Sequence, residues 1–170
     1  MLVRGRFLVS LCSLIIVATS GLAYGDQQDA RLTPLFEKLR TTSDSSEVPA
    51  VEQQIWQIWL EYEDPLIGEL LKRGLEAMAR QDLLLALAQF DQIVNDAPAF
   101  AEGWHKRSTV HYFMGDFEAS VRDIQRTLAL EPRHFGALSG LAVIYDHLDE
   151  PAAAIRSFEA ALAIHPHLSQ

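Results

Sequence analysis

The chain has 170 residues, 49% of them hydrophobic, which is enough for one domain with a packed core and too apolar for a disordered chain. Its formal net charge of -9 disfavours binding to nucleic acid and to anionic lipid, because both carry charge of the same sign. Glycine and proline are sparse and fall between periodic apolar segments, so the sequence favours helices joined by tight turns over a sheet protein.

Residues 1–25 have the pattern of a signal peptide. Two arginines precede an apolar run from Phe7 to about Ala18, and Ala23 and Gly25 follow with the spacing of a cleavage site. The run is short for a bilayer span of ~20 residues. We therefore predict an exported protein, periplasmic in a bacterium, with no membrane contact after cleavage. The alternative is an uncleaved segment that anchors the protein to the membrane.

Residues 26–64 are predicted to form a helical hairpin. Leu35, Phe36 and Leu39 share one helical face, the polar stretch 41–47 interrupts the pattern, and apolar positions then recur at helical spacing up to Tyr62. Two helices of this size amount to about one repeat of the kind described next. The segment is therefore either a degenerate repeat or a capping hairpin. Its Trp56 and Trp59 are expected to pack against the first full repeat.

The rest of the chain repeats itself every 34 residues. The period is marked by three prolines: Pro98, Pro132 and Pro166. Two columns between them hold small residues: Gly74, Ser108 and Ala142 in one, and Ala86, Ser120 and Ala154 in the other. A third column holds large apolar residues: Phe90, Ile124 and Phe158. A fixed period with recurring small and large apolar positions is typical of a solenoid of helical hairpins.

These columns resemble the tetratricopeptide repeat (TPR) family, and the middle repeat matches it best, through Trp104, Gly115-Asp116 and Pro132. The resemblance implies an all-α fold, a right-handed α-solenoid of three TPR helix-turn-helix repeats after the N-terminal hairpin. The repeats would occupy 65–166, as 67–100, 101–134 and 135–166, followed by a tail over 167–170. The chain is also similar to short exported bacterial TPR proteins of unassigned function.

Two arginines depart from the apolar pattern. Arg73 and Arg107 stand where the third repeat has Leu141, on a face that leans inward. A buried guanidinium needs a partner. We therefore predict a structural ion pair between Arg107 and Asp123, and a neutral counterpart between Arg73 and Gln89.

The boundary between the second and third repeats carries Glu131, Arg133 and His134 around a proline. Such a group suggests a reactive site, but its position in the period predicts a bend. The His134 position holds Phe100 one repeat earlier and Leu168 one repeat later, so it tolerates an apolar residue. We expect Glu131 and Arg133 to be solvated.

No motif in the sequence predicts an enzyme or a cofactor. Cys12, the only cysteine, lies in the predicted signal peptide, and no GxSxG, HExxH or glycine-rich phosphate loop is present. The six histidines have no metal-ligand spacing, so we predict no metal site.

The last predicted helix carries four apolar residues that no following helix covers: Ile155, Phe158, Leu162 and Ile164. They form either a small exposed face or a homodimer surface.

The resemblance to the TPR family implies a concave groove lined by the first helix of each repeat. The positions are Leu71, Leu75 and Met78, then His105, Thr109, Tyr112 and Phe113, then Ser139, Val143, Asp146 and His147. The implied function is a non-catalytic protein–protein interaction module that docks a protein or peptide, within an envelope complex. A membrane-anchored TPR scaffold is the alternative. Equally, the N-terminal hairpin would bury Leu71, Leu75 and Met78 as core if it folds over them.

Overall fold

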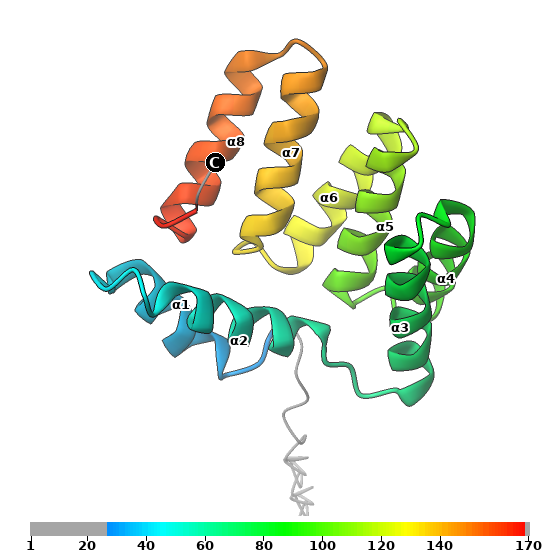
Figure 1. Cartoon of the computed structure of the whole chain (residues 1–170), viewed down its shortest axis with the longest axis horizontal. Coiled ribbons are helices and arrows are strands. Elements are labelled where there is room, and N and C mark those ends of the chain that lie inside the picture. Colours follow the sequence, from blue (N-terminus) through cyan, green and yellow to red (C-terminus); the bar gives the residue numbers. More distant parts are fainter. Residues whose placement is uncertain (1–26, 169–170) are drawn as a thin grey trace, which may run out of the picture.

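The computed structural model describes residues 27–168, and within that range it contains eight α-helices and no strand (Figure 1). The helices are α1 (Leu32–Thr41), α2 (Val48–Leu60), α3 (Pro65–Ala79), α4 (Leu83–Asp96), α5 (Ala101–Phe113), α6 (Phe117–Leu130), α7 (Phe135–His147) and α8 (Pro151–Ile164). The predicted all-α solenoid is confirmed. The predicted signal peptide lies outside the described residues.

Three antiparallel hairpins, α3/α4, α5/α6 and α7/α8, stack side by side (Figure 1). The turns inside the hairpins gather at one edge of the stack, which we call the turn edge. The bends between hairpins gather at the opposite edge, which we call the bend edge. At the turn edge Gly115 adopts a φ of 78° after α5, and the Asp116 carboxylate accepts the backbone N–H of Ala119 to cap α6. Pro151 opens α8 in the corresponding turn.

Small residues set the distance between the two helices of a hairpin. A Cβ atom on Gly74 of α3 would lie 2.5 Å from the ring of Phe90 on α4, so the glycine makes room for a fully buried aromatic ring. In the next hairpin the Ser120 hydroxyl donates to the Ser108 carbonyl at 2.8 Å, across the same kind of contact. The small columns of the repeat thus mark where helices approach most closely.

The N-terminal hairpin α1/α2 lies across the bend edge instead of extending the stack (Figure 1). Its two helices share a core with Phe135 of α7, and Ile164 and Leu168 near the chain's end also pack against that core. The prediction that both tryptophans pack against the first repeat is wrong. Trp59 stacks on His134 with ring centroids 4.3 Å apart, and Trp56 contacts Phe135 at 5.4 Å.

The hairpin also buries the second bend. Glu131, which we expected to be solvated, is only 2% exposed, so that prediction is wrong. Its carboxylate accepts hydrogen bonds from the backbone N–H and the guanidinium of Arg133, which lies over the Phe36 ring at 4.5 Å. Cover from α1 therefore removes this acid from water, and the neighbouring arginine replaces the lost hydration.

The last helix is less exposed than its sequence suggested. Ile164 packs against the N-terminal hairpin, and Phe158 and Leu162 are half-buried, which leaves Ile155 as the one strongly exposed residue of the four, at 57%. A homodimer through this helix stays a prediction, and the surface available to it is small.

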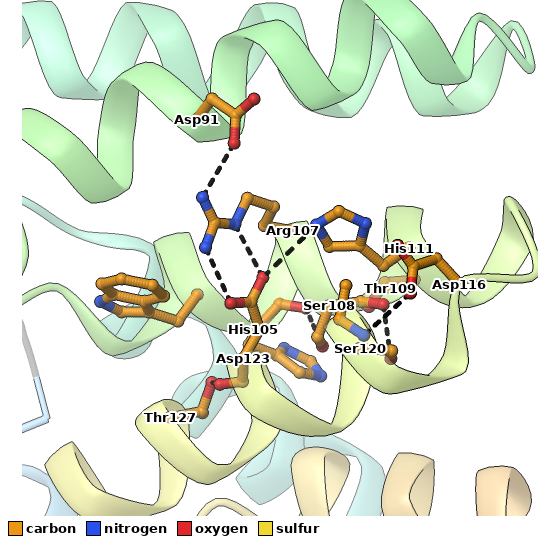
Figure 2. A network of polar contacts seen from close by, with 12 residues as sticks. Asp91, His105, Arg107, Ser108, Thr109, His111, Asp116, Ser120, Asp123 and Thr127 are labelled. Carbon is orange, nitrogen blue, oxygen red and sulfur yellow. Dashed lines mark hydrogen bonds and ion pairs between the residues drawn. The ribbon is translucent and has the colours of Figure 1, made fainter.

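Arg107 ties three helices together (Figure 2). Its guanidinium donates to both carboxylate oxygens of Asp123 on α6, at 2.7 and 2.8 Å, and to Asp91 on α4 at 2.8 Å. The predicted Arg107–Asp123 ion pair is therefore present, with an added partner in the preceding hairpin. The Arg73–Gln89 contact is wrong, because Arg73 is exposed and binds Glu69 one turn earlier on its own helix.

Among the described residues, no helix combines the length and the continuous apolar composition that crossing a membrane requires. The solenoid and its hairpin thus contain no candidate membrane span.

Replacement of Arg107 by leucine should lower the free energy of unfolding by about 2–4 kcal/mol, because it leaves the buried Asp123 carboxylate without its main partner. The double variant Arg107→Leu/Asp123→Ser copies the third repeat, which has Leu141 and Ser157 at these positions. It should recover most of the loss. Urea denaturation of the three proteins measures both effects, and equal instability of the single and double variants would contradict the assignment.

Candidate functional site

A pocket of about 240 Å³ opens between α5 and α7, with α6 as its floor. Its lining residues are His105, Ser108, Thr109, Tyr112, Phe113, Ser120, Ile124, Gly136, Ala137, Gly140, Val143 and Ile144. The pocket exists because the two facing helices carry small residues where they approach α6. We call it the α5/α7 groove.

The groove is apolar although several of its residues have hydroxyl groups. Ser108 and Thr109 both donate to the backbone carbonyl of His105, at 2.7 and 3.0 Å, and Ser120 donates to a backbone carbonyl as well. These bonds direct the hydroxyl hydrogens of Ser108, Thr109 and Ser120 to backbone carbonyls and not to a catalytic base.

Aromatic side chains form the mouth of the groove toward the turn edge. Tyr112 contacts Phe113 at a centroid distance of 5.6 Å and His147 of α7 at 5.8 Å. Phe113 is 60% exposed and Val143, across from it, is 39% exposed. An accessible apolar rim of this kind suits an interaction surface. Covering it removes apolar area from water, which lowers the free energy of the complex.

Trp56 of α2 closes the other end of the groove. Its ring stacks on His105 at 5.8 Å, and a Cβ atom on Gly136 would lie 2.7 Å from the ring edge. The Lys106 ammonium sits 5.0 Å above the same ring. The N-terminal hairpin therefore makes the groove a slot that is closed at the bend edge and open at the turn edge.

A buried polar cluster lies behind this end wall. Glu102 is 1% exposed and accepts a hydrogen bond from His134 Nε2 at 2.8 Å, while the Lys106 ammonium lies 3.2 Å from its other oxygen. His134 is fully buried, and its Nδ1 accepts the backbone N–H of Ala137 at 3.0 Å, which caps α7. The Nδ1 lone pair is thereby used, so the ring is the neutral tautomer with its proton on Nε2.

Burial affects the pKa of Glu102 and the pKa of His105, which also belongs to this cluster. Burial by itself raises the pKa of Glu102, but Lys106 and the two histidines outweigh it and hold that pKa well below its ordinary value. For His105, burial and the neighbouring His134 ring lower the pKa to about 4, against the opposing pull of Glu102. Near neutral pH Glu102 is therefore a carboxylate and His105 a neutral imidazole.

Glu102, His105 and His134 bring three ligand atoms within 4.8 Å of one another, a spacing that suits a metal ion. The hydrogen bonds argue against one. A neutral imidazole has a single lone pair, and that of His134 already accepts the Ala137 N–H. The Lys106 ammonium also already neutralises the Glu102 carboxylate, so it would compete with a metal ion for this ligand. The residues do not fit a metal site.

The predicted groove residues fall into two groups. His105, Thr109, Tyr112, Phe113 and Val143 line the α5/α7 groove, and His147 touches Tyr112 at its mouth. The three from the first repeat lie elsewhere. Leu71 is buried in the core of α3/α4, and Leu75 and Met78 are half-buried beside it, with Leu60 and Tyr62 in the same cluster.

Three residues that shape the site were not predicted: Trp56, Glu102 and His134. The repeat could have predicted the burial of His134, because the same column contains Phe100, which is only 1% exposed. Glu102 follows no such rule, because its column otherwise holds Gly68 and Gly136. Only the position of the N-terminal hairpin explains why an acid is buried there.

Acidification should destabilise the protein through His105. The unfolded chain takes up this proton near pH 6.5 and the folded protein only near pH 4, so stability falls as the pH drops through that window. The loss between pH 7 and pH 5 is on the order of 1–2 kcal/mol. His165, whose pKa burial also lowers, adds to it, whereas the stabilisation from Glu102 is lost only below about pH 4.5.

Urea denaturation at pH 7 and pH 5 measures this loss. His105→Gln should make it smaller, and His147→Gln, which alters an exposed imidazole, should leave it unchanged. An identical pH dependence in wild type and His105→Gln would show that this histidine takes up its proton equally in both states.

Comparison with known proteins gives consistent matches. The tetratricopeptide repeat family model matches residues 105–169. A TPR repeat-containing protein of Rhizobium etli is 31% identical over 136 residues, which are 80% of this chain and 67% of that protein. A BBSome complex member BBS4 homolog of Drosophila melanogaster is 28% identical over 93 residues, 55% of this chain and 19% of the relative.

Solved structures agree on the fold. A crystal structure of MamA protein superposes with a TM-score of 0.57 at 22% identity, covering 78% of this chain and 70% of that one. At this identity the likeness supports the arrangement of helices alone. The 34-residue period, the stacked hairpins and the similarity to the Rhizobium etli protein together show that this chain belongs to the tetratricopeptide repeat family.

Proposed function

We propose that this protein–protein interaction module docks a peptide segment of a partner protein in the α5/α7 groove, without catalysis. The observation that carries the proposal is the exposed aromatic rim, with Tyr112 and Phe113 facing Val143 above an apolar pocket. A large apolar side chain of a partner would displace water from this pocket and contact both helices. Extended and helical peptides both present such side chains.

The docking surface is confined to the second and third repeats. Leu71 is 5% exposed in the core of the first hairpin, and it therefore has little area to offer a partner. Leu75 and Met78 are half-buried and pack against the same core. The proposed contact residues are accordingly those of α5 and α7.

A second part of the proposal concerns location. Residues 1–25 have the order of charges, apolar run and small residues that secretion requires, so we propose an exported protein that works within an envelope complex. The alternative is a TPR scaffold held at the membrane by the same segment, left uncleaved.

Replacement of Tyr112 by alanine should weaken partner recovery about tenfold or more, because central aromatic residues contribute ~2 kcal/mol or more to such interfaces. A crosslinked pull-down of the protein from its own cell envelope measures recovery. Tyr145→Ala is the matched control, since Tyr145 lies on α7 but outside the groove, beside Phe117 and Val121. Equal recovery of every partner with both variants would refute docking in the groove.

Expression of the full coding sequence followed by N-terminal sequencing tests the location. Cleavage after Gly25 gives a mature chain that starts at Asp26, which we expect in the soluble periplasmic fraction. A chain that keeps residues 1–25 and sediments with membranes would support the anchored scaffold in its place.

A further inference from the structure

The α5/α7 groove has two different ends, and the difference bears on what it binds. The end at the bend edge is closed by Trp56, and the nearby Lys106 is already paired with the buried Glu102 at 3.2 Å. The end at the turn edge is open, with Phe113 and Val143 exposed. Trp56 therefore blocks the path over the bend edge, and a bound segment can extend over the turn edge.

The open end is acidic. The two turns that border it, 114–118 and 145–152, contain no lysine or arginine. All five of their carboxylate residues are exposed: Asp116, Glu118, Asp146, Asp149 and Glu150. Among them Glu118 forms an ion pair with Arg122 at 3.1 Å, so this nearby basic residue is neutralised locally.

The helix ends contribute little to this field. Although α5 and α7 end at the turn edge, at Phe113 and His147, α6 and α8 begin in the same turns, at Phe117 and Pro151. A helix C-terminus carries about half a negative charge and an N-terminus about half a positive charge, so the two ends in each turn oppose each other. The attraction for a cation at this edge therefore comes from the acidic side chains.

The size of the groove limits what enters it. Its volume of about 240 Å³ lies below the ~300–1,000 Å³ of pockets that enclose a whole small molecule. It suits one large side chain with the adjoining backbone. The surroundings of that side chain are largely apolar, because the hydroxyl groups of Ser108, Thr109 and Ser120 are bonded to helix carbonyls.

We infer that the groove takes a basic peptide of a partner protein, in which one aromatic or large aliphatic side chain fills the pocket and a neighbouring lysine or arginine lies over the acidic turn edge. The inference rests on the proposed function and adds the chemistry of the partner. The same charges disfavour an acidic peptide, since its carboxylates would lie beside Asp146 and the other exposed acids of the turn edge.

Selection of random peptides displayed on phage tests the inference, with protein purified after expression of its full coding sequence. Binders that are lost with Tyr112→Ala should combine a large apolar residue with lysine or arginine close to it. Phe113→Ala serves as a second groove variant, because Phe113 is 60% exposed and its loss leaves the core intact. Neutral or acidic groove binders would overturn the charge assignment and keep the docking function. Absence of any groove-dependent binder would overturn both.

Charge neutralisation tests the rim directly, with a selected peptide as the probe. The triple variant Asp146→Asn/Asp149→Asn/Glu150→Gln should weaken its binding roughly tenfold at low salt. The matched control Glu63→Gln/Asp96→Asn/Glu159→Gln changes the net charge equally at exposed acids away from the rim and should have less than about a twofold effect. Equal effects of the two triple variants would show that net charge, and not the rim, attracts the peptide.

Discussion

The His134 imidazole is the contact on which the arrangement of this protein depends. The ring caps α7 through Nδ1, donates to Glu102 of α5 through Nε2, and stacks flat on Trp59 of α2 with an interplanar angle of 7°. One side chain therefore joins the N-terminal hairpin to two successive hairpins of the solenoid. A substitution that loses the bond to Glu102 leaves a buried carboxylate without this partner, and one that loses the bond from Ala137 leaves α7 uncapped.

The position of the N-terminal hairpin decides the shape of the groove. If α1/α2 stacked on α3 as a further repeat, the groove would be open at both edges. Because α2 crosses the bend edge, Trp56 closes one end and the acidic turns border the other. The two ends of the groove therefore differ, whereas they would be alike in a simple run of repeats. The same placement accounts for the buried Glu131, since the bend it occupies is covered by α1.

Local chemistry explains which parts of the site the sequence predicts. Tyr112, Phe113 and Val143 follow from the resemblance to the TPR family, which implies that the first helix of each repeat lines a groove, and these three residues line the α5/α7 groove. The Arg107–Asp123 pair follows from charge and spacing together. Arg73 shows the limit of that reasoning. The repeat predicted Gln89 as its partner, but Arg73 binds Glu69, an acid one turn away on the same helix.

The sequence by itself determined the helices, their order, the 34-residue period and the faces that pack together, because these depend on residues close along the chain or related by the repeat. Only the tertiary structure decided where the N-terminal hairpin lies, and with it the burial of Glu102, Glu131 and His134. The hairpin falls outside the period, so no column constrains its docking. Its site is set by how well Trp56, Trp59 and Phe36 fit against the bends, which is a matter of shape in three dimensions.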